Sequence, residues 1–492
     1  MPTQGNAGPS LIERRSTFWI VVALIALLFA TTNLPWTLDD YDQAKQAFTS
    51  FEMVNEGHWF FQHTPNEKIA TKPPLVGWIS AATYGATRNW EIAWRLPSIA
   101  AAIALAVLVT RAATDAYGAA AGLIALSAFG LNMLSPRLAT LVRTDMPLAL
   151  ALFLLGLRIW SKIRNAEPWD RGDRLMMFAM LTAAMLIKGP IVYAFLSPGI
   201  VAFAWWKSAR QETVSAWCGW WPWIGSLAVF LTWVAAGIAW TPGFYEQVVL
   251  REFAGRFSET VHRPQPIYFY LPHVLHKFAP WSVLGIALAF IGWCGKKPAA
   301  ENRSRVPADV AWLLCWSFGG LLVMSLIPSK RVDRIFPIVP PLCLLVSAGV
   351  AKLSNLVPRV RRWTRVTLIS ACVIATGYAV QRLIPAYRSA DFALVEFSTE
   401  VRREAAARGL RYEVIGGPEE GLLLYLRRTH FAKTHEAISR WNTGSIDALV
   451  APAEKLALLL SELPGASASG LEGSITVGER RRTYVFLTRS SP

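Results

Sequence analysis

One polar segment near the N-terminus holds many of the groups that could carry chemistry. Residues 36–78 follow the first apolar stretch, and their ionisable side chains include three carboxylates, two histidines and a lysine, which are Asp39, Asp40, Asp42, His58, His63 and Lys72. Ionisable groups at the edge of a bilayer cost free energy, so they are retained mainly where they have a function. Carboxylates and imidazoles move protons, and a lysine binds anions. We therefore expect this segment to belong to the functional site.

The composition is that of a protein that crosses a membrane many times. The chain has 492 residues, of which 53% are hydrophobic and only 17% charged, and it contains 22 Trp. These values are too apolar for an ordinary soluble protein. The net charge of +16 lies almost entirely before residue 388, since 14 Lys and Arg face 13 Asp and Glu from that residue onward. A nucleic-acid-binding protein would carry its basic patch on a soluble domain, so we expect no nucleic-acid partner.

Apolar runs of helical length recur along the first 385 residues. Eleven of them are expected to cross the bilayer as helices, at residues 18–35, 92–110, 117–134, 147–160, 175–187, 191–206, 217–240, 281–293, 310–327, 335–351 and 366–383. Several are shorter than the roughly 20 residues of a full span and must include flanking residues. A weaker candidate at residues 73–85 is expected to lie along the interface. The sequence therefore predicts a polytopic α-helical membrane protein with about 11–13 spans.

The positions of Lys and Arg predict the orientation of the chain, because basic residues favour cytoplasmic loops. With the N-terminus inside, five loops on the cytoplasmic side carry the basic excess, at residues 111, 158–174, 207–210, 296–305 and 359–365. This register places the C-terminus outside. It also brings further polar groups to the outer face, among them Arg143, Asp145, Lys188, His262, Lys330, Arg331 and Arg334. Carboxylates and cations gathered on one face of the membrane resemble an assembled active site.

The composition changes after residue 385. Helical patterns at residues 396–409, 418–428 and 453–463 alternate with extended patterns at residues 412–415, 447–451 and 483–488. Such alternation is typical of a small α/β domain. We therefore divide the chain into a transmembrane domain at residues 1–385, with outer loops at residues 37–90 and 241–279, and a soluble C-terminal α/β domain at residues 386–492.

Short motifs follow one another in a fixed order between residues 15 and 350. They are Asp42-Gln-Ala-Lys-Gln-Ala, Met53-Val-Asn-Glu-Gly-His-Trp59, Lys72-Pro-Pro-Leu-Val-Gly-Trp78, Arg95-Leu-Pro-Ser98, Arg143-Thr-Asp-Met146, Lys188-Gly-Pro190, Arg256-Phe257 with His262, Pro266, Tyr268, Tyr270 and Pro280-Trp281, and Ser329-Lys-Arg331. Each motif is weak alone, but the ordered series resembles the GT-C superfamily of glycosyltransferases that use a polyprenyl-phosphate sugar. The branch that it resembles holds the aminoarabinose transferases and the protein O-mannosyltransferases.

The resemblance implies a role for most of the polar groups. Sugar transfer to a hydroxyl needs a carboxylate to take the proton, and it needs cations to bind the leaving phosphate. Asp42 is expected to be the general base, with Asp40 as a rival in the same loop and Asp145 as a second candidate carboxylate. The donor phosphate is expected to meet Lys72, Arg143, Lys330, Arg331 and Arg334.

Plainer interpretations of the same residues stay open. Asp42 could be a helix cap or a surface carboxylate, and Asp145 could be an internal partner of Arg143. Lys72 could be an ordinary interfacial lysine. The basic turn around Lys330 could bind lipid headgroups instead of the donor.

A metal ion is the least supported part of the resemblance. The aminoarabinose branch can hold one at a histidine that corresponds to His262, with help from a Glu before the Lys-Pro-Pro turn. This chain has Thr71 in place of that Glu. In this chain Asp42 is followed by Gln43, whereas the family commonly has a Glu at that position. The resemblance thus implies no obligatory cofactor, and a divalent metal at His262 remains a hypothesis.

The sequence is best explained by an inverting glycosyltransferase of the bacterial inner membrane with its active site and C-terminal domain in the periplasm. Its partners would be a polyprenyl-phosphate sugar donor, a lipid, glycan or protein acceptor, and membrane lipids. One alternative is a transporter or flippase of lipid-linked saccharides, which should concentrate ionisable residues in the middle of its spans. Another is a non-catalytic subunit for envelope assembly. The donor sugar and the acceptor stay open.

Overall fold

The chain folds into two compact units. In the computed structural model, the described residues are 14–38, 41–65, 68–210, 214–253, 255, 264–294, 306–354, 356–388, 393–416, 419–477 and 480–489. Unit 1 comprises residues 1–32, 96–140 and 144–380, and unit 2 comprises residues 33–95, 141–143 and 381–492. Asp40 and His262 lie outside the described residues.

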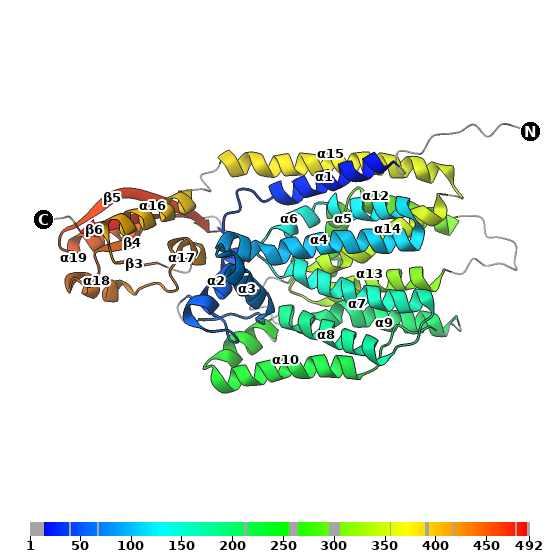
Figure 1. Cartoon of the computed structure of the whole chain (residues 1–492), viewed down its shortest axis with the longest axis horizontal. Helices are drawn as coiled ribbons and strands as arrows, with labels where there is room; N and C mark the ends of the chain where they lie inside the picture. The colour runs from blue at the N-terminus through cyan, green and yellow to red at the C-terminus, as the bar shows by residue number, and fades with distance from the viewer. Residues whose placement is uncertain are drawn as a thin grey trace, which may run out of the picture. The chain divides into compact units, whose positions relative to one another are not determined.

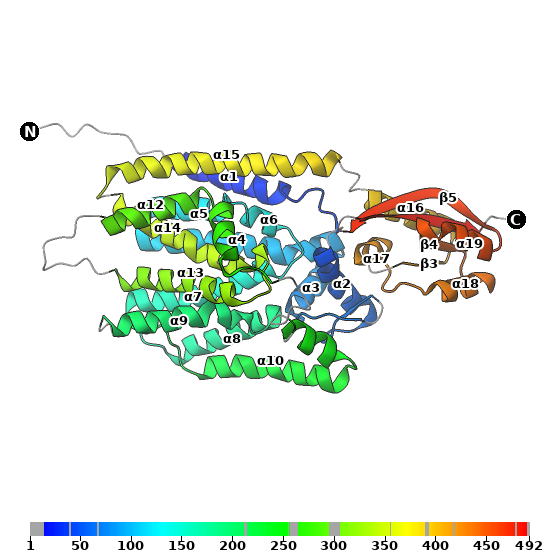
Figure 2. The same ribbon diagram turned by 180° about the vertical axis from the view of Figure 1, so that it is seen from behind.

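Unit 1 is a bundle of helices whose long members run side by side (Figures 1 and 2). Its elements are α1 (Arg15–Thr31), most of α4 (Trp90–Tyr117), α5 (Ala119–Gly130), α6 (Ser135–Ala139), α7 (Asp145–Asn165), α8 (Arg171–Lys188), α9 (Ile191–Ser208), α10 (Trp221–Trp240), η2 (Tyr245–Phe253), η4 (Ile267–Phe269), α11 (Tyr270–Lys277), α12 (Trp281–Cys294), α13 (Ala308–Leu326), η5 (Val332–Ile338), α14 (Val339–Leu353) and most of α15 (Pro358–Arg388). Each of the eleven predicted apolar runs overlaps one of these helices.

Seven helical segments among the described residues are long and apolar enough to cross a bilayer, or eight if the bent pair α11–α12 counts as one. They are α4, α7, α9, α10, α13, α15 and the continuous segment η5–α14. This number is lower than the eleven predicted spans because α1 and α5 are apolar but shorter than 18 residues, while α8 begins with charged residues. The predicted fold class is nevertheless confirmed: the chain is a multi-pass helical membrane protein with a small C-terminal sheet.

Burial separates the central helices from the outer ones. In the most apolar stretch of α7 and in that of η5–α14, 72% of the residues are buried, whereas only 28% are buried in α10 and α15. The outer helices expose large apolar side chains such as Trp240 and Val373. Because a bilayer solvates apolar surfaces, such side chains are suited to face lipid.

Small residues allow two of the helices to approach closely. A Cβ added at Gly319 of α13 would lie 2.7 Å from the backbone nitrogen of Gly199 in α9. The two backbones therefore meet at this crossing without intervening side chains, which is the packing that small residues permit between membrane helices.

Unit 2 combines the polar segment after α1 with the end of the chain. Its N-terminal part contains α2 (Tyr41–Glu56), the short antiparallel pair β1 (His63–Thr64) and β2 (Lys68–Ile69), α3 (Leu75–Thr87) and the start of α4. With 13 residues, α3 is about 20 Å long, which is too short to cross the hydrocarbon layer.

The C-terminal part of unit 2 is built around a four-stranded sheet. Its elements are α16 (Ala393–Arg408), β3 (Tyr412–Val414), α17 (Glu420–Leu426), α18 (Thr434–Asn442), β4 (Ala448–Pro452), η6 (Ala453–Lys455), α19 (Leu456–Glu462), β5 (Ala466–Val477) and β6 (Arg480–Arg489). The strand order is β3-β4-β6-β5, with β3 and β4 parallel and the other pairs antiparallel. The expected helices and strands of this region are present, and α18 and β5 were not predicted.

One hydrophobic core joins the two parts of unit 2. Phe48 and Phe51 of α2 belong to the same buried cluster as Leu422 and Leu423 of α17 and Phe486 of β6. The helix that carries Asp42 therefore packs on the C-terminal part of the same unit, although more than 300 residues separate them in the sequence.

Candidate active site

Asp42 lies in the first turn of α2. A carboxylate at this end of a helix is stabilised by the helix dipole. Its side chain is 30% exposed, and Oδ2 lies 3.5 Å from a guanidinium nitrogen of Arg143, whose side chain is only 8% exposed. The two side chains form an ion pair, and the distance between them is longer than that of an ideal hydrogen bond. Asp42 is thus held by a cation and still reachable from solvent, so that its carboxylate could take a proton from a bound hydroxyl.

Gln43 fixes the segment that carries Arg143. The side-chain oxygen of Gln43 accepts a hydrogen bond from the backbone nitrogen of Val142 at 3.2 Å. Gln43 is buried, and Leu141 to Arg143 belong to unit 2 with α2. A Glu is common at this position in the superfamily that the motifs resemble, and here the amide instead holds the backbone next to Arg143.

Lys72 reaches the same face of α2. Its ammonium donates to the side-chain oxygen of Gln46 at 3.4 Å. Gln46 follows Asp42 by four residues, and side chains at this spacing lie on one face of a helix. Lys72 and Arg143 thus both bring positive charge to the face of α2 that carries Asp42.

Arg95 binds the backbone at Trp36, shortly before Asp42. Its guanidinium donates to the backbone oxygen of Trp36 and also binds Glu91. The guanidinium carbon lies 5.5 Å from the centre of the Trp36 ring, within range of a cation–π interaction. Arg95 is 1% exposed, so its charge is satisfied internally. Arg95, the first residue of the Arg-Leu-Pro-Ser motif, therefore has a structural role at Trp36 that the sequence did not indicate.

Asp145 and Lys188 form an ion pair inside unit 1. Asp145 lies in the first turn of α7, and Lys188 lies in the last turn of α8. Each charge therefore has the sign that its helix end favours. The two side chains are 10% and 11% exposed. A buried carboxylate with a close ammonium partner is less accessible to an acceptor than Asp42.

Lys330, Arg331 and Arg334 form a basic turn in unit 1, and they differ in their exposure. The ammonium of Lys330 donates to the backbone oxygen of Gln265 at 2.8 Å, and burial lowers the pKa of Lys330. Arg334 donates to the backbone oxygen of Ser329 at 2.9 Å and to its hydroxyl at 3.1 Å. The side chain of Arg331 is exposed.

The predicted site residues thus fall into two groups. Asp42, Lys72 and Arg143 belong to unit 2, and the other described site residues belong to unit 1, namely Asp145, Lys330, Arg331 and Arg334. The structure brings the first three together around one helix.

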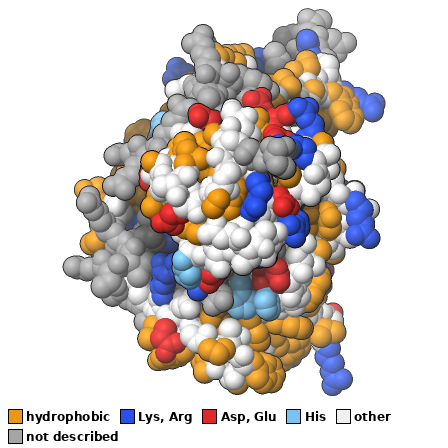
Figure 3. Space-filling view, turned by 90° about the vertical axis from the view of Figure 1, so that its left-hand side faces the viewer, with side chains coloured by type: hydrophobic (Ala, Val, Ile, Leu, Met, Phe, Trp, Pro, Cys, Tyr) orange, Lys and Arg blue, Asp and Glu red, His pale blue; other side chains and the backbone are white. Residues whose placement is uncertain are grey.

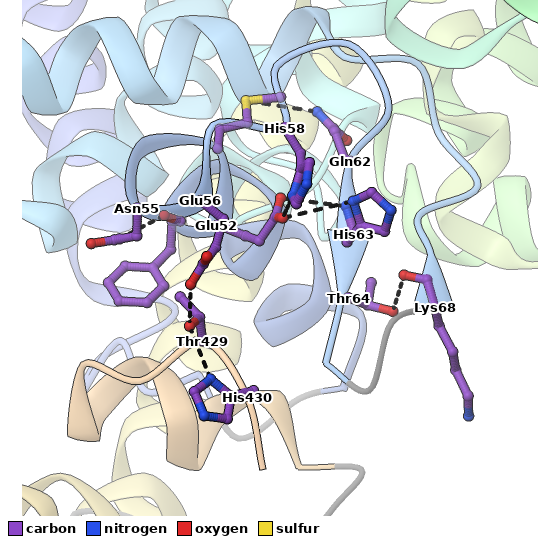
Figure 4. Close-up of polar contacts among 12 residues, drawn as sticks. Glu52, Asn55, Glu56, His58, Gln62, His63, Thr64, Lys68, Thr429 and His430 are labelled. Atoms are coloured by element: carbon purple, nitrogen blue, oxygen red, sulfur yellow. Dashed lines mark hydrogen bonds and ion pairs between the residues drawn. The ribbon is translucent and has the colours of Figure 1, made fainter. Parts of the chain in front are cut away.

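Glu52, His58 and His63 form a cluster of which the sequence indicated only the two histidines. Glu52 of α2 contacts His58, and its Oε1 lies 3.7 Å from Nδ1 of His63 (Figure 4). Burial raises the pKa of Glu52, and the contact with His58 opposes that rise. The two histidines stood out in the sequence, but Glu52 lies in a helical pattern that did not distinguish it from the carboxylates around it.

Charged groups of both signs are interspersed on one face of the molecule, where histidine side chains lie close to carboxylates (Figure 3).

The chain is similar to known transferases in sequence and in fold. No family model matches it. It is 23% identical over 401 residues to the undecaprenyl phosphate-alpha-4-amino-4-deoxy-L-arabinose arabinosyl transferase of Pectobacterium atrosepticum, covering 75% of this chain and 66% of that protein. It is 26% identical over 351 residues to the protein of the same name from Yersinia pestis, covering 68% of this chain and 58% of that protein. The chain therefore spans less than two thirds of the length of these relatives.

The fold similarity extends over nearly the whole chain. The crystal structure of ArnT from Cupriavidus metallidurans bound to undecaprenyl phosphate superposes with a TM-score of 0.67 and 17% identity, covering 96% of this chain and 98% of that one. Both the bundle and the C-terminal sheet therefore have counterparts in one solved protein. The chain is thus similar in sequence to the aminoarabinose transferases and has the fold of ArnT, in agreement with the resemblance that the ordered motifs indicated.

Proposed function

We propose that this protein is an inverting glycosyltransferase that moves a sugar from a polyprenyl monophosphate to an acceptor hydroxyl. The relatives' names specify transfer of 4-amino-4-deoxy-L-arabinose from undecaprenyl phosphate. A donor of this chemical class is therefore the first to test for this chain. The acceptor is a lipid, a glycan or a protein hydroxyl.

The observation that supports this function best is the arrangement around α2. Asp42 is partly exposed at the helix N-terminus, it pairs with a buried Arg143, and Lys72 binds Gln46 one turn along the same face. The face thus combines a carboxylate that can accept a proton with cations that can bind a phosphate.

In the proposed reaction, Asp42 accepts the proton of the acceptor hydroxyl as its oxygen bonds to the anomeric carbon. The bond between that carbon and the phosphate oxygen breaks from the opposite side, and the electron pair leaves with the polyprenyl phosphate. Lys72 and Arg143 offset the growing negative charge on the phosphate. Asp145 holds Lys188 in place within unit 1 through their ion pair.

The reaction is proposed to take place on the periplasmic face of the inner membrane. The distribution of Lys and Arg supports this orientation, since the loops that carry the basic excess fall on the opposite side from residues 36–78. The C-terminal domain shares its core with α2 and is proposed to lie on the same side.

The test is sugar transfer by the purified chain from radiolabelled polyprenyl-phosphate sugars to membrane extracts. The parent should label an acceptor, and Asp42→Asn should lose roughly 10²–10⁴-fold in rate, the range for loss of a general base. Asp115→Asn is the matched control, because this carboxylate is exposed in α4 and lies outside the proposed site. Equal rates for Asp42→Asn and the parent would refute the role of Asp42. No transfer from any donor of the panel would refute the proposed activity.

A further inference from the structure

The end of α2 and the hairpin that follows it bring three metal-binding side chains together. Glu52 lies in α2, His58 follows the helix, and His63 begins β1. One ligand atom from each lies within 4.8 Å of the other two. Figure 4 shows both imidazoles directed toward the carboxylate of Glu52.

The spacing of these atoms suits a small divalent ion. Glu52 Oε1 and His63 Nδ1 are 3.7 Å apart. Two ligands of a tetrahedral Zn²⁺ with bonds of about 2.1 Å are separated by about 3.4 Å. The His58 ring also contacts Glu52, and the two imidazole centres are 4.3 Å apart. An ion between the three groups therefore needs only small side-chain movements.

The type of donor also favours zinc. Two imidazoles and one carboxylate are a recurrent set of three protein ligands for Zn²⁺, with a fourth position left for water or another oxygen. An oxygen-only site would suit Mg²⁺ or Ca²⁺, and imidazole nitrogen disfavours both. The side chain of His58 is 48% exposed, so an ion and its water can enter from solvent.

The backbone around the cluster is already ordered by other contacts. The backbone nitrogen of His63 donates to Glu52 Oε2 at 3.4 Å, and the nitrogen of Ala70 donates to Gln62 across the hairpin at 2.7 Å. The indole of Trp78 donates to the backbone oxygen of Trp59 at 2.7 Å. These bonds fix both ends of the loop that carries His58, which lowers the entropy cost of forming the site.

We propose that Glu52, His58 and His63 bind one Zn²⁺ ion that holds residues 57–65, which include β1, against the end of α2. Ten residues of helix, about 15 Å, separate Glu52 from Asp42, so the ion is a structural support and not a part of the proton transfer. The site also differs from the one at His262 that the motifs suggested. The inference does not depend on the proposed transfer activity.

The experiment uses the full-length protein in detergent. The protein is stripped with a chelator, incubated with Zn²⁺, freed of excess ion and analysed for bound metal by mass spectrometry. The parent should retain one Zn²⁺ per chain. His58→Ala, His63→Ala and Glu52→Gln should each reduce retained Zn²⁺ by tenfold or more. His435→Ala is the control, because its imidazole is 78% exposed and remote in sequence from the cluster, and it should retain the ion fully.

Two further measurements guard against misfolded variants. Co²⁺ in place of Zn²⁺ should give the parent the visible absorption bands of a tetrahedral nitrogen and oxygen site, and His58→Ala should lack them. Without metal, the parent and His58→Ala should have the same melting temperature, which shows that the variant folds. Zn²⁺ should then raise the melting temperature of the parent and leave that of His58→Ala unchanged. Less than a tenth of an ion in the parent, or full retention in the His58→Ala variant, would overturn the proposal.

Discussion

The backbone nitrogen of Leu38 donates a hydrogen bond to the hydroxyl of Tyr425 at 2.8 Å, across 387 residues of sequence. Leu38 is fully buried and comes four residues before Asp42. Tyr425 lies in α17, in the C-terminal part of unit 2. The C-terminal part of unit 2 therefore holds the chain three residues before α2 begins. This contact gives the domain a role in positioning, whatever part it has in binding the acceptor.

Removal of the Tyr425 hydroxyl should loosen the start of α2. Tyr425→Phe leaves the buried nitrogen of Leu38 without its acceptor, which costs about 1–3 kcal/mol. Hydrogen exchange should show faster opening of residues 33–56 than in the parent. Tyr245→Phe is the control, because the Tyr245 ring is 46% exposed. Unchanged exchange in residues 33–56 would show that the bond does not support this segment.

Asp42 and Arg143 should behave as one unit in catalysis. Arg143→Met removes the cation beside Asp42, and we expect transfer to fall by at least about 10²-fold, as for loss of a positioned electrostatic partner. Groups that act together are not additive, so the Asp42→Asn and Arg143→Met double variant should lose little more than Asp42→Asn alone. Steady-state rates of the three variants test this. Losses that multiply would mean that the two residues act independently.

Asp145 and Lys188 should depend on each other for stability. Lys188→Met leaves a buried carboxylate without its cation, a loss of about 3–5 kcal/mol for a buried pair. The double variant Lys188→Met with Asp145→Leu removes both charges and should recover much of the lost stability. Thermal unfolding in detergent measures the difference. If Lys188→Met melts with the parent, the pair has no structural role.

Glu420 should make unit 2 less stable as the pH rises. Burial raises the pKa of this carboxyl from 4.5 to about 7, and nearby Lys45 and Lys68 offset only part of that rise. A raised carboxyl pKa favours the folded state below pH 4.5, and this contribution is lost as the pH increases through 7. Glu420→Gln should therefore match the parent near pH 5 and be more stable at pH 8, by up to about 3 kcal/mol.

The comparison with Glu436→Gln isolates this effect. Glu436 is in the same domain, and its side chain is 51% exposed. That variant should show the same pH dependence as the parent in thermal unfolding. A Glu420→Gln protein that is no more stable than the parent at pH 8 would show that Glu420 is neutral or well solvated in the folded state.

Much of the fold could be predicted from local patterns. Every apolar run overlaps a helix, because in lipid the backbone must satisfy its own hydrogen bonds and a helix does so locally. The patterns of α16, β3, α17, β4 and β6 were equally clear. β5 was not, because its sequence Ala-Ser-Ala-Ser-Gly-Leu-Glu-Gly-Ser-Ile-Thr-Val lacks an alternation of apolar and polar residues and contains a bulge after Ala468.

The contacts that complete the site could not be predicted from one sequence. Nothing near Gln43 indicates that its amide would bind the backbone at Val142, and nothing near Leu38 points to Tyr425. Such pairs are set by tertiary packing and leave no local periodicity. Asp42 and Lys72 were identifiable because they lie in motifs of the superfamily that the sequence resembles, whereas Glu52 became conspicuous only when the fold placed two imidazoles beside it.

The division of unit 2 between both ends of the chain sets an order for its assembly. Residues 33–95 emerge early, but the apolar partners of α2 in α17 and β6 come only after residues 96–380 have been made. At about 5–20 residues per second, the ribosome needs roughly 15–60 s for that stretch. During this time the aromatic face of α2 has only part of its partners, such as Trp90 of α4, whose ring centre lies 5.3 Å from that of Phe51. The helix that carries Asp42 is thus among the last parts of the protein to mature, and the nascent chain cannot complete this core before its C-terminal domain is synthesised.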